Sequence, residues 1–169
     1  MACLPTDAQS HCWLGWAGVC GALAVLIGAF GAHGLPDHLS AMGLDQLLIQ
    51  RRLDQFDVGA RYHLAHAIAL LALSTLPTSR RQVRTVRWTY RLMWTGVLLF
   101  SGSLYVLVLT NTPWLGAITP LGGLAWIAAW TLLAIAGFFP VRNGDEHHRE
   151  TQTIAPEPDS AENRSGASR

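Results

Sequence analysis

The stretch from Cys12 to Ala32, CWLGWAGVCGALAVLIGAFGA, runs for twenty-one residues without a charged side chain. A helix that rises about 1.5 Å per residue would be roughly 30 Å long over this stretch, which is the thickness of a bilayer's hydrocarbon core. The stretch therefore predicts a transmembrane helix. Because it lacks a positive n-region and exceeds the roughly 7 to 15 residues of a signal-peptide core, we expect it to stay on the mature protein.

The composition favours a membrane protein as well. Half of the residues are hydrophobic, 14% are charged and the formal net charge is +1, whereas a soluble domain usually carries about a quarter charged residues. This balance predicts the lipid bilayer as a partner and no nucleic acid. The cysteines Cys3, Cys12 and Cys20 have no metal-binding spacing, and we interpret them as packing or incidental residues.

Three further apolar segments follow the first, and each is long enough, or nearly so, to cross a membrane as a helix. Together they predict spans at about 12–32, 58–76, 92–110 and 120–139. We therefore predict an all-α fold, an integral membrane four-helix bundle over 12–139, after a short N-terminal segment over 1–11. The tail over 140–169 is polar, mixes charged residues with Ser, Pro and Gly, and is predicted to be disordered.

Two helix boundaries stay open at this stage. Segment 44–58 is either a short amphipathic helix at the interface, between the first two spans, or an upstream extension of the second span. Its helical period appears in residues spaced by four and three, namely Ile49, Leu53, Phe56, Ala60 and His63. The fourth helix either begins with Thr119 as its cap and Pro120 in its first position, or runs through both with a kink.

The arginines predict the orientation. Five of them precede or open the third span with no acidic residue among them, namely Arg80, Arg81, Arg84, Arg87 and Arg91. The positive-inside rule places this loop in the cytoplasm. With four spans, both the N-terminus and the C-terminus are then predicted to be cytoplasmic.

Small residues predict where helices pack closely. One stripe along the first helix repeats at intervals of four and three, and two adjacent glycines lie near the start of the fourth helix. Small side chains let neighbouring helices approach, so that van der Waals contact can drive association inside a bilayer. The predicted helix-packing residues are Ala17, Gly21, Ala24, Gly28, Gly31, Gly122 and Gly123.

Four ordered motifs then stand out. They are Gly28-Ala-Phe-Gly-Ala-His33-Gly34-Leu35, Arg61-Tyr62-x3-His66-Ala67-x-Ala69-Leu70-Leu71, Phe100-Ser101-Gly102-Ser103-Leu104-Tyr105, and Gly116-Ala117-Ile118-Thr119-Pro120-Leu121-Gly122-Gly123. Over about residues 13–137 the chain resembles the YgdD-like and transmembrane protein 256 family, or domain of unknown function 423. The resemblance implies a four-helix protein of the bacterial inner membrane and implies no activity. Three features depart from the family pattern. They are the long stretch between His33 and Tyr62, the histidine at position 63, and the polar tail.

The predicted topology gathers the polar motifs near the non-cytoplasmic end. Because polar groups in a membrane are costly unless paired, we hypothesise one polar cluster there. Its members are His33, Arg61, Tyr62, His66, Ser101, Ser103, Tyr105 and Thr119. The alternative is structural: His33 and Arg61 can reach water at the interface, and Tyr62 suits an aromatic belt.

Metal binding and catalysis receive little support from the sequence. His63 and His66 are three residues apart on one helix, and His33 could add a third nitrogen, but no Cys or Met joins them. We keep them as weak metal candidates and predict no cofactor. The spans contain no GxSxG elbow, HExxH motif or paired carboxylates, so we predict that the protein is not an enzyme.

Two classes of function follow. The first is a structural or interaction protein that binds a membrane-protein partner, or a second copy of itself, through its Gly and Ala faces. The alternative is the handling of a small molecule, an ion or a proton at the polar cluster around His33, Arg61, His66 and Tyr105, since His66 could carry a proton near neutral pH.

Overall fold

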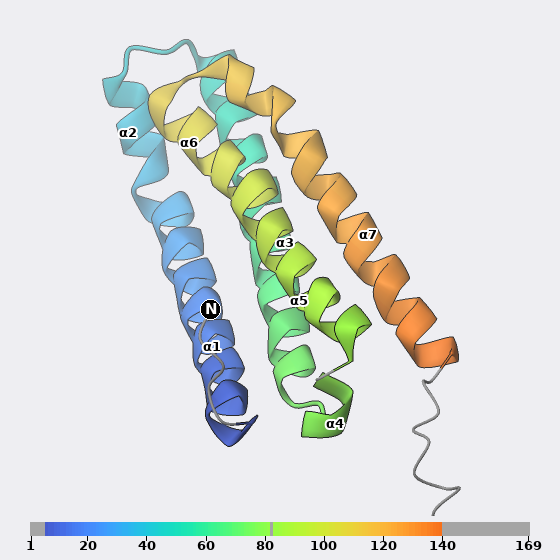
Figure 1. Ribbon diagram of the computed structural model, residues 1–169. Helices are drawn as coiled ribbons and strands as arrows, with labels where there is room; N and C mark the ends of the chain where they lie inside the picture. Colours follow the sequence, from blue (N-terminus) through green and yellow to red (C-terminus); the bar gives the residue numbers. More distant parts are fainter. Residues whose placement is uncertain (1–5, 82, 140–169) are drawn as a thin grey trace, which may run out of the picture. The chain divides into compact units, whose positions relative to one another are not determined.

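The computed structural model describes residues 6–81 and 83–139, with side chains from residue 12 onward, and this part of the chain is helical without a strand (Figure 1). The all-α prediction is confirmed. The tail over 140–169 that we predicted to be disordered lies outside the described residues. The elements are α1 (Thr6–His33), α2 (Leu35–Ala41), α3 (Gln46–Ser74), α4 (Thr78–Arg81), α5 (Arg84–Gly96), the π-helix η1 (Val97–Gly102), α6 (Ser103–Thr110), the 3₁₀ helix η2 (Pro113–Ala117) and α7 (Thr119–Phe138).

In the described part of the chain, three helical stretches are long and apolar enough to cross a membrane. They are Cys12–His33 in α1, Arg84–Thr110 through α5, η1 and α6, and Pro113–Phe138 through η2 and α7. Helix α3 is not among them, although it is the longest single helix. Its first half carries several charged residues, namely Arg51, Arg52, Asp54, Asp57 and Arg61.

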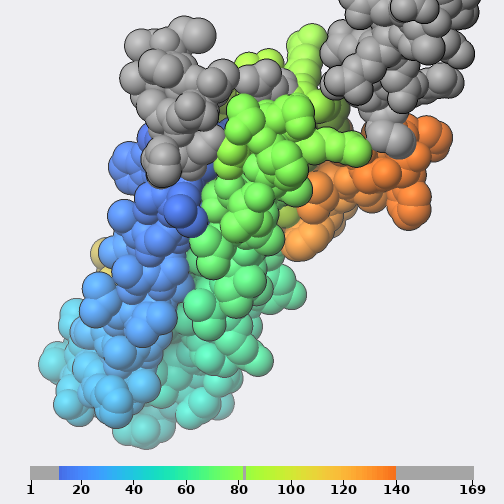
Figure 2. Space-filling model, turned by 90° about the horizontal axis from the view of Figure 1, so that it is seen from below, coloured from blue at the N-terminus to red at the C-terminus, as the bar shows by residue number. Residues whose placement is uncertain are grey.

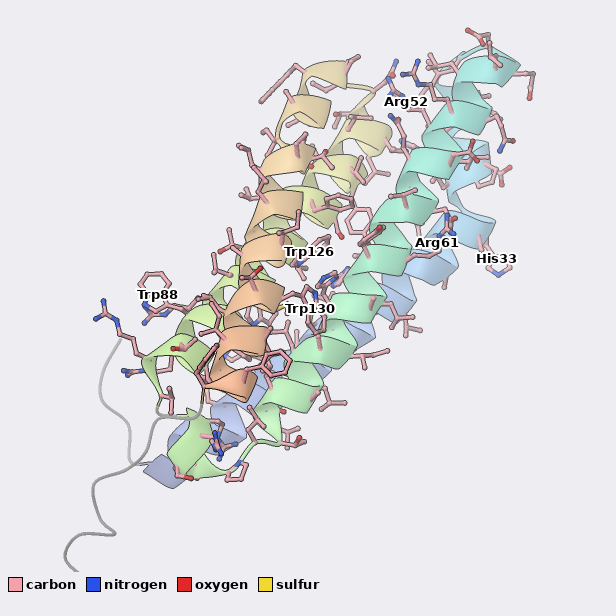
Figure 3. All side chains as sticks on the ribbon, turned by 90° about the vertical axis from the view of Figure 1, so that its right-hand side faces the viewer. His33, Arg52, Arg61, Trp88, Trp126 and Trp130 are labelled. Carbon is pink, nitrogen blue, oxygen red and sulfur yellow. The ribbon has the colours of Figure 1, made fainter. Side chains whose placement is uncertain are left out.

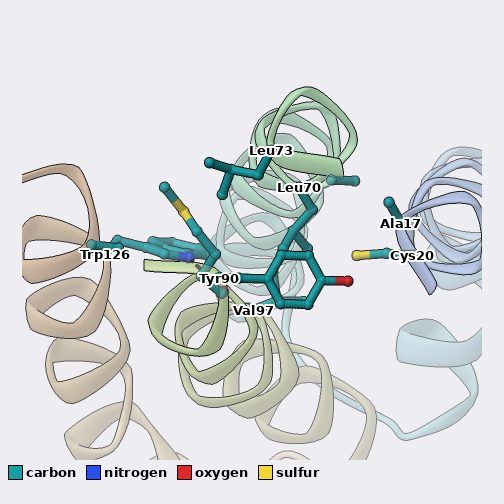
Figure 4. Close-up of a cluster of buried hydrophobic side chains, with 10 residues drawn as sticks. Ala17, Cys20, Leu70, Leu73, Tyr90, Val97 and Trp126 are labelled. Carbon is teal, nitrogen blue, oxygen red and sulfur yellow. Dashed lines mark hydrogen bonds between the residues drawn. The ribbon is translucent and has the colours of Figure 1, made fainter. Parts of the chain in front are cut away.

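The long helices form a layer with α3 and α5 in its middle (Figure 4). Helix α1 packs along α3 at one edge, and α7 packs along α5 and η1 at the other. In the most apolar segment of the central stretch, 44% of the residues are buried by the chain itself, compared with 17% in α1 and 22% in the stretch that contains α7. The two edge helices therefore leave most of their apolar surface uncovered by the chain itself.

Helix α3 starts at a side-chain cap. The Asp45 carboxylate accepts a hydrogen bond of 2.9 Å from the Leu48 backbone N–H, which satisfies one of the free donors at the helix start. The helix then continues without a break to Ser74. Segment 44–58 is therefore the upstream extension of the second predicted span. The separate short helix between the first two long helices is α2 instead, which the sequence analysis did not predict.

The buried stripe of α3 agrees with the predicted one except at two positions, where the neighbouring residue is buried instead. It repeats at intervals of three and four and consists of Ile49, Arg52, Phe56, Gly59, His63, His66, Leu70 and Leu73. Arg52 and Gly59 take the places that the sequence pattern gave to Leu53 and Ala60, both of which are half-buried. Gly59 is buried because α6 lies against it: an added Cβ would be 3.2 Å from the Tyr105 ring.

Glycines also set the contact between the third stretch and α7. A Cβ at Gly122 would overlap the backbone of Phe100 in η1, and one at Gly96 would overlap the indole of Trp126. A Cβ at Gly123 would lie 3.9 Å from the Phe100 ring, which is an ordinary van der Waals contact. The π-helix therefore lies directly against α7 at a point where only a glycine fits.

The predicted stripe on α1 needs a correction. Ala17 and Ala24 are buried, and Gly31 lies against the Phe56 ring, where a Cβ would come within 2.7 Å. A Cβ at Gly21 or Gly28 would meet nothing within 4 Å. These two glycines flank the contact between α1 and α3, so neither marks a close approach within the described chain.

We predict that Gly122→Ala lowers the stability of the purified protein by about 1–3 kcal/mol, the cost of overpacking a filled contact, because a backbone cannot move aside as a side chain can. Gly28→Ala is the matched control and should be close to neutral, since its new methyl group meets no atom within 4 Å. Thermal unfolding in detergent measures both. Equal midpoints for the two variants would contradict the close packing of η1 on α7.

Candidate functional site

The residues of the predicted polar cluster do not form one group. His33 is exposed at the end of α1, and no hydrogen bond joins its side chain to another described residue. The Arg61 side chain is 70% exposed and pairs with the Asp57 carboxylate at 2.7 Å. Figure 3 shows both side chains on the side of α3 away from Trp126 and Trp130. Two of the eight predicted members therefore stand apart, because each helix presents them to the outside of the layer.

His66 faces α7, where its contacts fix its protonation. Its Nδ1 lies 2.8 Å from the Tyr62 carbonyl oxygen, and a carbonyl can only accept, so Nδ1 carries the proton. The Nε2 is then free to accept from the indole N–H of Trp130, at 3.4 Å. The imidazole lies flat on Trp126, with ring centroids 3.6 Å apart and planes 6° apart. His66 is thus held as a neutral ring with both nitrogens occupied.

Aromatic rings surround this histidine. Tyr62 stacks on Trp126 at 5.7 Å, and Phe100 of η1 lies 4.8 Å from the same indole. The Trp126 N–H donates to the Met93 carbonyl at 3.1 Å. The sequence analysis missed both tryptophans, although the four-residue spacing of Trp126 and Trp130 places them on one face of α7. The group packs α3, η1 and α7 together and leaves none of these ring nitrogens without a partner.

A second group joins three helices around His63. The Cys20 sulfur of α1 lies 3.4 Å from His63 Nε2, and the Tyr105 hydroxyl of α6 lies 3.2 Å from His63 Nδ1. Cys20 is fully buried and His63 is 4% exposed. Cys20, which we had interpreted as a packing or incidental residue, thus belongs to a hydrogen-bonded chain of three side chains. His63 and His66 contact different helices, so the structure does not unite them.

The hydroxyl groups form the third set of contacts. Ser101 donates to the Gly59 carbonyl at 2.9 Å, which ties η1 to α3. Ser103 and Thr119 share a hydrogen bond of 2.9 Å, which ties α6 to the start of α7. Of the predicted cluster, these three residues bind helices to one another, as hydroxyls commonly do inside membrane proteins.

Arg52 is a buried cation that was not among the predicted site residues. It is 5% exposed, and its Nε and Nη2 donate to the Asn111 side-chain oxygen at 3.0 and 2.6 Å. Its Nη1 donates to Gln55 at 2.9 Å. The signal in the sequence is its spacing from Ile49 and Phe56, by three and four residues.

The backbone conformation of Asn111 is unusual. It ends α6 in a left-handed conformation, with φ of 49°, which Asn tolerates better than most residues. No carboxylate in the described part of the chain pairs with Arg52, so amide oxygens alone hold the guanidinium. Among the same residues, no three His, Cys, Asp or Glu side chains are grouped as metal ligands would be.

The chain matches a known family model and several curated proteins. The model described as "Protein of unknown function (DUF423)" matches residues 27–123. The UPF0382 membrane protein YwdK of Bacillus subtilis is 40% identical over 114 residues, which cover 68% of this chain and 85% of that protein. The UPF0382 inner membrane protein YgdD of Escherichia coli K12 is 30% identical over 132 residues, which cover 78% of this chain and 93% of that protein. No solved structure matches.

These relatives carry names that state a membrane location and no activity. Within residues 6–81 and 83–139, three stretches can cross a membrane by length and composition. The family model covers more than half of the chain, and it is the family that the four motifs resemble. The chain is thus a membrane protein, and it belongs to the DUF423 family of unknown function.

Proposed function

We propose that the protein crosses the inner membrane four times and acts there as a structural or interaction protein. The fourth crossing is α3, which runs alongside α1 on one side and α5 to α6 on the other (Figure 1). Its second half, from Tyr62 to Ser74, has no charged residue. Pairing of His63 and His66 with neighbouring helices lowers the cost of carrying them through a bilayer. The inner membrane is the location that the name of the Escherichia coli relative states for that protein.

We further propose an orientation with both termini in the cytoplasm. The end of the layer at α4 and the start of α5 carries five arginines over positions 80–91 and no acidic residue in that segment. The opposite part of the layer, α2 and the first half of α3, mixes Arg51, Arg52 and Arg61 with four aspartates, Asp37, Asp45, Asp54 and Asp57. The positive-inside rule favours the arginine end as the cytoplasmic one.

The open face of α1 carries the proposed interaction role. Only 17% of the α1 window is buried by its own chain, and a Cβ at Gly15 or Gly18 would meet nothing within 4 Å. Ala22 lies on the same exposed side. An apolar transmembrane helix of another membrane protein can approach closely where side chains are this small. We therefore take such a helix as the partner, bound at Gly15, Gly18 and Ala22.

Co-purification tests this role. The full chain, extracted from its native membrane with surrounding lipid, is expected to bring one membrane protein in a fixed ratio, and Gly18→Leu should remove it by blocking close approach. Gly137→Leu on α7 is the matched control, because this glycine is also exposed with open space around it. Mass spectrometry of the complex gives the ratio. A chain recovered with lipid alone, or only with further copies of itself, would refute this partner.

The group around His63 favours proton handling as a second candidate function. Either Cys20 donates to Nε2 while Nδ1 donates to Tyr105, or Tyr105 donates to Nδ1 while Nε2 donates to Cys20. The two arrangements use the same three side chains with the protons shifted. A proton added at one end can thus leave at the other, which is the property that a relay requires.

Proton flux distinguishes the two candidates. Purified protein in liposomes with an imposed pH gradient should collapse that gradient if the chain relays protons, and His63→Ala should abolish the flux because it removes the middle member. His66→Ala is the matched control, since His66 contacts α7 and not Cys20 or Tyr105. A pH-sensitive dye inside the liposomes records the rate. Equal flux in liposomes with and without the protein would rule out proton handling.

A further inference from the structure

We propose that the exposed arginines at the start of the third crossing bind the headgroups of anionic phospholipids. This arginine face consists of Arg80 in α4 and Arg84, Arg87 and Arg91 in α5. Figure 2 views the molecule from this end, where the green region of α4 and α5 lies at the surface between α1 and α7. The inference rests on the membrane location of α5 to α6 and not on the role proposed above for α1.

The geometry gathers the cations on one side of α5. Arg84, Arg87 and Arg91 are spaced by three and four residues, so they lie on one side of the helix, and all three are exposed. The residues that α5 buries lie toward the other side, namely Val86, Thr89, Tyr90, Met93 and Gly96. The packed side of α5 therefore faces the layer, and its basic side faces outward.

No described carboxylate neutralises this face. The acidic side chains that the structure describes are Asp37, Asp45, Asp54 and Asp57, and all of them lie at the opposite end, on α2 and the first half of α3. Arg81 has a different role: its Nη1 donates to the Ser74 carbonyl at 2.6 Å and its Nη2 to Thr78 at 3.0 Å, which closes the end of α3. Arg81 is therefore not counted in the arginine face.

Aromatic side chains place the arginine face at headgroup depth. Trp88 is 46% exposed, and the Arg91 guanidinium lies 5.3 Å above its ring. At the same end Trp13 stacks on Tyr90 at 4.0 Å, and Trp16 meets Trp94 edge-on at 6.4 Å. Trp and Tyr gather at the membrane–water interface, where lipid phosphates begin. A guanidinium binds a phosphate with two parallel hydrogen bonds, so this face has the chemistry of an anionic headgroup site.

Native mass spectrometry of the full chain, offered phosphatidylglycerol and phosphatidylcholine in equal amounts, tests the proposal. The wild type should retain phosphatidylglycerol preferentially, and each arginine removed should weaken that retention about fivefold. Arg84→Gln, Arg87→Gln and Arg91→Gln together should abolish the preference, and high salt should weaken it in the wild type. Arg51→Gln is the matched control, because Arg51 is exposed at the end that holds the four aspartates.

Three outcomes would overturn the proposal. The first is a triple variant that folds, by its circular dichroism, and keeps the lipid preference. The second is displacement of the lipid by millimolar inorganic phosphate, which would make the site one for free phosphate. The third is a wild type that shows no preference for phosphatidylglycerol, together with a variant combining Asp145→Asn, Glu146→Gln and Glu150→Gln that does show it. That result would mean that the arginine face binds the acidic tail of the same chain.

Discussion

The polar groups on the buried stripe of α3 constrain the rest of the structure. A buried helix face cannot leave a guanidinium or an imidazole without a partner, because no water reaches it to replace one. Arg52 binds Asn111 at the end of α6, His63 binds Cys20 of α1 and Tyr105 of α6, and His66 meets Trp130 of α7. One helix thereby fixes the position of three others. Apolar contact alone would not do this, since lipid tails are as apolar as the helices.

Small residues make these polar contacts possible. Gly59 lets α6 approach α3, since an added Cβ there would lie 3.2 Å from the Tyr105 ring, and its carbonyl accepts a hydrogen bond from Ser101. Phe100 lies against α7 because Gly122 has no side chain. Both contacts involve η1, the π-helical turn in the third stretch. π-helical turns of this kind occur often at functional sites, and here the backbone of the turn lies against α7 at a position where an added Cβ would overlap it.

Much of the fold could be predicted from the sequence, and most of the site could not. Long uncharged runs predict a helix without knowledge of its neighbours, and the motifs predicted the family. The contact of Arg52 with Asn111 joins positions 59 residues apart, and that of His66 with Trp130 joins positions 64 apart. No local pattern contains such pairings. We assigned His33 and Arg61 to the polar cluster from the predicted topology. Topology indicates near which end of a helix a residue lies, but not which side of the helix it occupies.

The fourth crossing is the claim on which the arrangement depends, since α3 carries five charged residues in its first half and is not among the three stretches that are apolar enough to cross by composition. Single accessible cysteines test it most directly, introduced as Met42→Cys before α3 or Ser79→Cys after it, in a chain whose Cys3 and Cys12 are replaced by alanine and whose buried Cys20 is kept. A membrane-impermeant maleimide is added to intact cells and to broken cells. Four crossings predict labelling at position 42 in intact cells and at position 79 only in broken cells. Labelling of both positions from the same side would show that α3 does not cross.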